Sequence, residues 1–367
     1  MGFRESAVED LEVVRPSGQF WRGKRVLVTG HTGFKGSWLA LWLNELGAEV
    51  HGVSRPPDQR PNLYSLAKVC KISKTHFVDI RQAGQVRKVI GKIKPQIIFH
   101  LAAQPIVRVG YSMAKETWDT NLTGTIHLLE AARKLSSLKV IVVVTTDKVY
   151  RNNEKGASFV ETDPLGGKDP YSASKAAADL ATSSYHQGFF QRMGVGVATA
   201  RAGNVIGGGD WARDRIVPDA IRSWRKGKAL LVRNPASIRP WQHVLDSLGG
   251  YLILAEKLWK NPRLSGAYNF GPESSDRKTV RELIQQAKGF SDKGRVVLGS
   301  CKRGPAEARV LALNNSKAKK QLGFQPVWGF QQAVGRTFEW YASQSKGEDA
   351  QKLCLEDIRA YEKQALR

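Results

Sequence analysis

Short apolar runs alternate along the chain with longer segments in which apolar residues recur at helical spacing. The apolar runs are Arg25–Thr29, Glu49–Val53, Ile97–Leu101, Val140–Thr146 and Gly194–Ala200. Segments with helical character lie between them at 36–46, 120–134 and 171–186. Strands that alternate with helices build βαβ units. The pattern therefore predicts an α/β fold, a Rossmann-like doubly wound parallel sheet with helices on both faces.

The alternation weakens after residue 202. Glycine and proline become frequent between residues 203 and 240, and mixed helices follow. We expect residues 21–202 to form the dinucleotide-binding domain, with later strands contributed from 235–275. Residues 203–367 should form mainly a smaller, mixed α/β substrate-binding lobe that is interleaved with the main domain. Residues 1–20 are expected to be a leader.

Composition and charge narrow the class of protein. The 367 residues contain no apolar run long enough to span a bilayer, so no membrane association is expected. Three cysteines without close spacing argue against a disulfide framework or a metal site and favour a cytoplasmic protein. The formal charge of +24 would suit nucleic-acid binding. The basic residues are spread along the chain, however, so we regard nucleic acid as an unlikely partner.

A glycine-containing turn follows the first predicted strand and opens a helix. Its glycines are Gly30, Gly33 and Gly36. Glycines allow the backbone to turn tightly and to approach a pyrophosphate, which the free N–H groups of the helix end can bind. The turn predicts a dinucleotide site that also includes Thr32, Phe34 and Lys35.

The later strand ends supply the rest of this site. Ser54 and Arg55 follow the second strand, where a carboxylate would normally bind the ribose of NAD, so the sequence leaves NADP open beside NAD. Asp79 and Ile80 are expected to meet the adenine. The remaining expected cofactor-binding residues are Leu101, Ala102, Ala103, Gln104, Asn121, Thr145, Tyr171 and Lys175.

Tyr171 and Lys175 stand four residues apart and therefore lie on one helix face. Tyrosine has a pKa of about 10, and a neighbouring ammonium group lowers it by stabilising the phenolate. The pair predicts a tyrosine general base. Thr146, at the end of the preceding strand, is placed to bind a sugar hydroxyl.

Asp147 and Lys148 follow Thr146 and form an acid–base pair. A simple alcohol dehydrogenase or a 4-epimerase has no need of extra proton carriers at this point. Elimination of water needs both an acid for the departing oxygen and a base for the carbon beside the new ketone. The five expected catalytic residues are Thr146, Asp147, Lys148, Tyr171 and Lys175.

Several longer runs resemble the CDP-glucose 4,6-dehydratase family of extended short-chain dehydrogenases. They are TGHTGFKGSWL (29–39), AAQP (102–105), TTDKVY (145–150), DPYSASK (169–175), RAGNVIGGGDWARDRIVPD (201–219) and IRPWQHV (238–244). The resemblance extends from about residue 20 to at least residue 330. It implies a lyase that uses tightly held NAD to make CDP-4-keto-6-deoxyglucose for surface polysaccharides such as O-antigen, and it implies a homodimer or tetramer.

The resemblance also implies roles for individual residues. Tyr171 would take the 4-hydroxyl proton, Asp147 would protonate the departing 6-oxygen, and Lys148 would stand where related dTDP-glucose enzymes have a glutamate. The expected substrate-binding residues are Gln104, Arg108, Asn204, Trp211, Arg215, Arg239 and Trp241. The runs at 304–309 and 313–317 depart from the family pattern, which predicts a modified nucleotide pocket.

Two alternatives stay open at this stage. Another nucleotide-sugar dehydratase or a 4-epimerase on the same scaffold would share most of these motifs, although the Asp147–Lys148 pair argues against an epimerase. A non-catalytic basic binding protein would have no use for the intact Tyr171–Lys175 pair.

Overall fold

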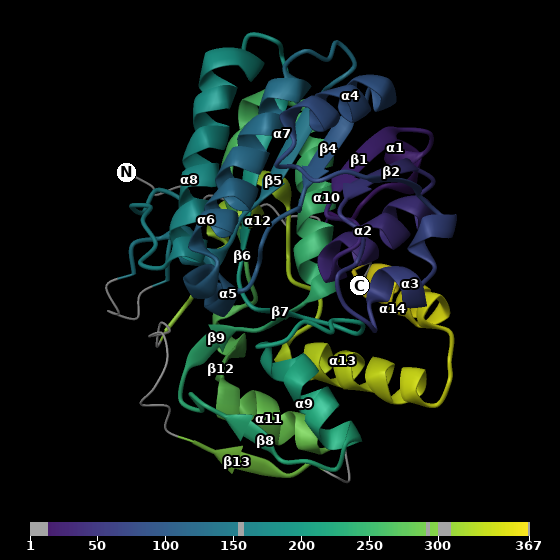
Figure 1. Cartoon of the computed structure of the whole chain (residues 1–367), viewed down its shortest axis with the longest axis vertical. Helices are drawn as coiled ribbons and strands as arrows, with labels where there is room; N and C mark the ends of the chain where they lie inside the picture. The colour runs from purple at the N-terminus through teal and green to yellow at the C-terminus, as the bar shows by residue number, and fades with distance from the viewer. Residues whose placement is uncertain (1–13, 153–157, 291–293, 300–309, 366–367) are drawn as a thin grey trace, which may run out of the picture.

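The computed structural model describes residues 14–152, 158–290, 294–299 and 310–365, and a seven-stranded sheet forms its centre (Figure 1). The strand order is β11-β6-β5-β4-β1-β2-β3, and every neighbouring pair is parallel. The strands are β1 (Arg25–Thr29), β2 (Glu49–Ser54), β3 (Lys74–Phe77), β4 (Ile97–His100), β5 (Val140–Val144), β6 (Gly196–Ala202) and β11 (Gly266–Phe270). The predicted Rossmann-like α/β fold is confirmed.

Alternate side chains of the strands enter two separate cores, one on each face of the sheet. Val26 and Val28 of β1 pack with Trp38 on one face, whereas Leu27 packs with Ile90 on the other. Because both faces of the sheet are buried around its inner strands, β1, β4 and β5 consist largely of apolar residues, whereas the edge strand β3 does not. The covering helices are α2 (Phe34–Glu45), α4 (Ala83–Ile93), α7 (Gly124–Ala132), α8 (Pro170–Tyr185), α10 (Val244–Lys260) and α14 (Ala350–Gln364).

A smaller lobe lies below the sheet in Figure 1, at the carboxyl ends of its strands. Three two-stranded sheets, β10-β7, β12-β9 and β13-β8, belong to it. Their strands are β7 (Val205–Ile206), β8 (Leu230–Val232), β9 (Ile238–Pro240), β10 (Gln242–His243), β12 (Arg277–Thr279) and β13 (Val296–Leu298). The lobe's helices are α9 (Ile216–Arg225), α11 (Val280–Lys288) and α13 (Phe330–Ser345).

Short segments complete the described chain. The short α-helices are α1 (Gly18–Trp21), α3 (Leu63–Leu66), α5 (Val107–Ser112), α6 (Ala114–Trp118) and α12 (Ser316–Leu322). The 3₁₀ or π segments are η1 (Val69–Lys71), η2 (Asp119–Thr123), η3 (Asp147–Val149), η4 (His186–Phe190), η5 (Pro262–Leu264) and η6 (Ser274–Asp276). None of the described helices combines the length and apolar character that a membrane span requires.

The lobe and the main body share the second half of the chain. After β6 ends at Ala202, the chain enters the lobe, returns to the body for α10 and β11, and enters the lobe again. Helix α14 then packs against α2 in the body. The expected leader boundary at residue 20 falls inside α1, whose Trp21 indole donates a 2.7 Å hydrogen bond to Glu256 in α10. The earlier part of the expected leader, 1–13, lies outside the described residues.

Candidate active site

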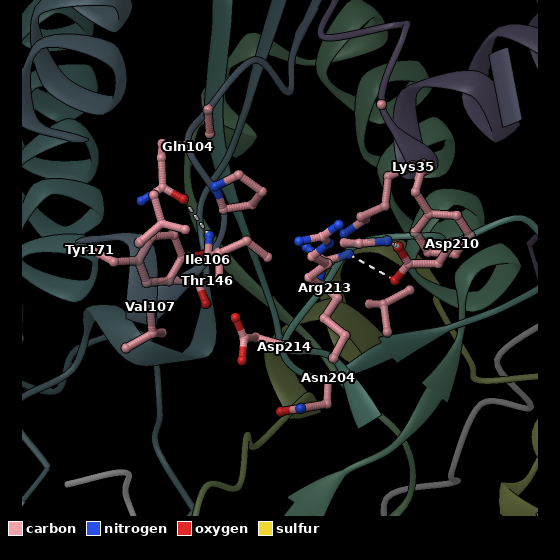
Figure 2. Close-up of a pocket in the computed structure, with 18 of the residues that line it drawn as sticks. Lys35, Gln104, Ile106, Val107, Thr146, Tyr171, Asn204, Asp210, Arg213 and Asp214 are labelled. Atoms are coloured by element: carbon pink, nitrogen blue, oxygen red, sulfur yellow. Dashed lines mark hydrogen bonds and ion pairs between the residues drawn. The ribbon is translucent and has the colours of Figure 1, made fainter. Parts of the chain in front are cut away.

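A cleft of about 1380 Å³ lies between the carboxyl ends of the sheet and the lobe. In Figure 2, Tyr171, Thr146 and Gln104 lie on one side of it, and Lys35 and Asp210 lie on the other. The residues that the sequence predicts for the site come from the ends of β1 to β5, from α2, α5, η2 and α8, and from the lobe, yet all but two of them line this one cleft. The two exceptions are Asn121 and Asp147.

The turn after β1 is shaped for close approach of an anion. Gly30 has φ +74°, and a Cβ on Gly36 would lie 2.1 Å from the carbonyl oxygen of Gly30, so neither position accepts a side chain without movement. Helix α2 begins after Gly33, and no side chain caps its first N–H groups. Free N–H groups at a helix start bind phosphate. The turn therefore fits a dinucleotide pyrophosphate.

The ends of β2 and β3 border the same turn. The Thr32 hydroxyl bonds the Ser54 hydroxyl at 2.8 Å and donates to the Arg55 carbonyl at 3.0 Å. The Arg81 guanidinium forms an ion pair with the Asp79 carboxylate, with 2.6 Å between Arg81 Nη2 and Asp79 Oδ2. That hydrogen bond holds the pKa of Asp79 below its usual value. The carboxylate expected to meet the adenine is therefore already paired.

The loop after β4 is held by its own side chains. Gln104 accepts a 2.6 Å hydrogen bond from Ile106 N, visible in Figure 2, and donates to Thr117. Asn121 accepts from Gln104 N at 2.8 Å and donates to the Ser174 hydroxyl at 3.0 Å. Asn121 thus fixes the loop to α8 from behind and does not reach the cleft.

Tyr171 and Lys175 lie on the buried face of α8. Burial raises the pKa of Tyr171 to about 12, and its hydrogen bond with Thr146 opposes that shift only in part. The Lys175 ammonium donates to the Val144 carbonyl at 2.7 Å, and burial lowers its pKa to about 8. The Lys175 ammonium is directed to the end of β5, and desolvation dominates at the phenol of Tyr171, so the role of Lys175 in tuning Tyr171 stays a prediction.

The Asp147–Lys148 pair lies directly beside Thr146, in η3. Asp147 Oδ1 accepts from the Thr146 hydroxyl at 3.0 Å and from Lys148 Nζ at 2.9 Å. Lys148 lines the cleft, while Asp147 is almost wholly buried behind it against Gly203. Asp147 Oδ2 has no hydrogen-bond partner in the described part of the chain. The pair thus presents an ammonium to the cleft and keeps one buried carboxylate oxygen unsatisfied.

Lys35 extends from the glycine turn into the same region. Its Nζ donates to the Tyr251 hydroxyl at 2.8 Å. Burial first, and then the nearby Arg215 and Lys175, lower the pKa of Lys35 to about 7. Helix α2, which begins at the glycine turn, therefore also places the Lys35 amine close to the expected catalytic residues.

Arginines approach the cleft from the lobe and from α5. Arg215 pairs with Asp210 at 2.9 Å, and Arg239 donates to the Ile238 carbonyl while it lines the cleft. Arg108 faces Asp214 at 3.5 Å across the opening. Guanidinium groups suit a sugar diphosphate because they bind phosphate oxygens in pairs.

The lobe also supplies an amide and two indoles. Asn204 Oδ1 is buried without a hydrogen-bond partner in the described residues, and Figure 2 shows Asn204 at the cavity wall. Trp211 and Trp241 touch the cleft but are 6% and 3% exposed, and Trp241 donates to the Lys278 carbonyl. Both indole rings therefore belong mainly to the hydrophobic core of the lobe, and a nucleotide base in the cleft can contact only their exposed edges.

Sequence reasoning missed several groups that shape the cleft. Asp210 and Tyr251 hold Arg215 and Lys35, and Asp214 and Glu116 each contact two arginines. The GGGDW run contains Asp210 and could have indicated it. Nothing near Tyr251 or Glu116 in the sequence signals a site. The unusual run 304–309 lies outside the described residues.

Comparisons with known proteins agree with this geometry. A family model described as GDP-mannose 4,6 dehydratase matches residues 27–337. A CDP-glucose 4,6-dehydratase from Salmonella typhimurium is 43% identical over 93% of this chain and 97% of its own length. GDP-mannose 4,6 dehydratase 1 from Arabidopsis thaliana is 27% identical over 89% of this chain and 90% of its own.

Solved structures share the fold. A UDP-glucose 4-epimerase from Thermus thermophilus, in complex with NAD, has a TM-score of 0.74 at 26% identity and covers 87% of this chain and 99% of its own. A dTDP-glucose 4,6-dehydratase from Bacillus anthracis, also with NAD, has a TM-score of 0.72 at 23% identity, covering 88% and 98%. Sequence and fold together show that this chain belongs to the nucleotide-sugar 4,6-dehydratase family of hydro-lyases, and within it to the CDP-glucose 4,6-dehydratases.

Proposed function

We propose that this enzyme converts CDP-glucose to CDP-4-dehydro-6-deoxyglucose and water. The observation that carries the proposal is the hydrogen-bonded Asp147–Lys148 pair beside Thr146 and Tyr171. Oxidation of a sugar alcohol needs only Tyr171 and its neighbours, whereas elimination of water needs the additional acid and base. The identity to a CDP-glucose enzyme supports the choice of nucleotide.

The cofactor that fits the cleft is NAD. The residues that would hold it are those of the glycine turn, with the ends of β2, β3 and β4 for the adenosine half and with Tyr171 and Lys175 for the nicotinamide half. When bound, the dinucleotide supplies the oxidation at C4 that makes the C5 proton acidic and the matching reduction at C6.

The protein's own groups carry the protons. Tyr171 takes the proton of the 4-hydroxyl, which Thr146 orients. Asp147 and Lys148, joined by a 2.9 Å hydrogen bond, are the acid and the base of the proposed elimination. In this scheme Lys148, as a neutral amine facing the cleft, accepts the C5 proton. Asp147, as a carboxylic acid buried behind it, supplies the proton of the departing 6-oxygen through the Thr146 hydroxyl, which is hydrogen-bonded to Asp147 Oδ1 at 3.0 Å and lines the cleft, and the C6–O bond breaks to release water.

The test is incubation of the purified protein with CDP-glucose and NAD, followed by mass analysis of the nucleotide sugar. We expect a product lighter by one water, absent when Tyr171→Phe replaces the wild type. UDP-glucose and dTDP-glucose are run in parallel and should give little product.

Other results would change the assignment in defined ways. Water loss from another nucleotide sugar only would retain the reaction and reject the proposed nucleotide. Formation of an epimer from any sugar, without water loss, would reject the roles given to Asp147 and Lys148.

We further propose that the enzyme is a cytoplasmic homodimer whose product enters the synthesis of surface polysaccharides. Support for the dimer comes from exposed apolar side chains on neighbouring helices of the main body. Leu180 of α8 is 59% exposed, and Trp118 of α6, which packs against α8, is 37% exposed. Burying such side chains against a second copy would be favourable.

A further inference from the structure

The adenosine end of the cleft lacks the carboxylate that usually selects NAD. In the dinucleotide fold the adenosine ribose lies at the carboxyl end of the second strand, where an acidic residue bonds its hydroxyls. Here β2 ends at Ser54, whose hydroxyl is tied to Thr32 of the glycine turn at 2.8 Å. The next residue is Arg55, which is 48% exposed and lines the cleft. If only the residues at the end of β2 are considered, this end of the cleft would favour the 2′-phosphate of NADP.

A carboxylate reaches the same place from another element. Glu116 of α6 lines the cleft 61 residues farther along the chain. It contacts the Arg55 guanidinium at 3.4 Å and the Arg81 guanidinium at 3.1 Å. Glu116 is 29% exposed, so both pairs are partly shielded from water. Glu116 therefore bridges the two arginines that could otherwise bind a phosphate.

The other ion pairs of Arg55 and Arg81 compensate most of their remaining positive charge. Arg81 is also bound by Asp79 at 2.6 Å, and Arg55 has Asp58 at 3.8 Å. Two guanidinium groups thus face three carboxylates. A 2′-phosphate brought to Arg55 would have to break the bond to Glu116 and then lie beside its charge. A ribose hydroxyl carries no charge and meets no such penalty.

We propose that Glu116 is the residue that selects NAD over NADP in this enzyme, by neutralising Arg55 and Arg81. Glu116, which lies on α6, performs the function that a carboxylate at the end of β2 normally performs. The inference rests on the proposed function only in requiring that the cleft binds a dinucleotide.

The test measures binding of NAD and of NADP separately by calorimetry, without substrate. Wild type should bind NAD more tightly. In Glu116→Gln, which keeps the side-chain size and removes the charge, the NADP-to-NAD ratio of dissociation constants should fall about tenfold or more, mainly through tighter NADP binding. The matched control is Glu45→Gln. Glu45 is 28% exposed and pairs with Arg359 at 2.8 Å outside the residues that line the cleft, so the ratio in this variant should change less than about threefold.

A double variant tests whether the tighter NADP binding in Glu116→Gln depends on the Arg55 guanidinium. Adding Arg55→Gln to Glu116→Gln should return NADP binding to about the wild-type level, because the phosphate would lose the guanidinium that Glu116 had released. An unchanged ratio in Glu116→Gln, or an equal shift in Glu45→Gln, would overturn the inference while NAD binding upheld the proposed function. Folded wild-type protein that binds neither dinucleotide would overturn both.

Discussion

At the scale of single residues, the proposed elimination depends on the Asp147–Lys148 pair. Lys148 faces the cleft, and Asp147 lies buried behind it with one oxygen unsatisfied. A buried carboxylate oxygen without a hydrogen-bond partner is costly. The proposed acid form of Asp147 carries no charge and would be less costly to bury than the carboxylate.

Replacing Lys148 by methionine should therefore remove the base and leave the fold intact. We expect kcat for water loss to fall by about 10²-fold or more, because general bases contribute on that order. In heavy water the wild-type product should carry deuterium at C5, since the amine exchanges its protons with solvent. The measurement is product formation by mass, with the isotope placed by NMR.

The control for this variant is Lys168→Met, which removes an exposed lysine from the margin of the same cleft. It should change KM more than kcat. A Lys148→Met enzyme that kept kcat within about fivefold of wild type would show that another group removes the C5 proton.

Residue identities were the most predictable part of the site. The motifs at the ends of β1, β5 and the start of α8 placed Gly36, Thr146 and Tyr171 in one cleft, because parallel strands end at the same edge. The partners of those residues were not predictable. Glu116 reaches Arg55 from a different helix, and Tyr251 reaches Lys35 across 216 positions, so only the folded chain shows them.

At the scale of an element, the start of α2 determines whether a dinucleotide can bind. A Cβ on Gly36 would lie 2.1 Å from the Gly30 carbonyl oxygen, whereas a Cβ on Gly33 would lie 3.3 Å from it. Gly36→Ala must therefore displace the turn, and we expect its dissociation constant for NAD to rise about tenfold or more. Gly33→Ala should have a smaller effect. Calorimetric titration of both folded variants with NAD checks this order, and equal effects would contradict it.

Helix α10 carries a second element-scale feature, a buried carboxyl that binds the C-terminal part of the chain. Asp246 Oδ1 accepts from Val327 N at 2.7 Å and from the Tyr361 hydroxyl of α14 at 3.1 Å. Burial raises the pKa of Asp246 to about 7. Since an unfolded aspartate has a pKa of about 3.9, the folded state holds an extra proton between about pH 4 and pH 7. The free energy of unfolding therefore falls as pH rises through that range.

Asp246→Asn should flatten this pH dependence, because an amide does not ionise and keeps the accepting oxygen. Between pH 5 and pH 8 the free energy of unfolding should fall by about 1–3 kcal/mol less in the variant than in wild type, as measured by urea unfolding. A slope of the same sign should remain, since burial also raises the pKa of Glu256 and of Asp357 to about 7. Exposed Glu348→Gln is the control and should leave the wild-type slope unchanged. A wild-type slope in Asp246→Asn would contradict the assignment.

At the scale of the whole molecule, the sequence pattern predicted the sheet well and the lobe poorly. The inner strands β1, β4 and β5 are buried on both faces, so their apolar runs are easily recognised in the sequence. The lobe strands β7 to β10 are only two or three residues long, too short for periodicity to identify them. The return of the chain to the body for α10 and β11 depends on packing between distant segments, and the sequence indicated only the range in which it occurs.

The last prediction concerns assembly. If α8 and α6 form the interface between two copies, a charge at Leu180 must be buried there, and an unpaired buried carboxylate opposes association. Leu180→Glu should therefore shift the protein from dimer to monomer in sedimentation experiments at micromolar concentration. Leu298→Glu changes a similarly exposed leucine, 48% against 59%, on the lobe and should leave the dimer intact. Dissociation by Leu298→Glu alone would move the interface to the lobe, and a monomeric wild type would exclude the dimer altogether.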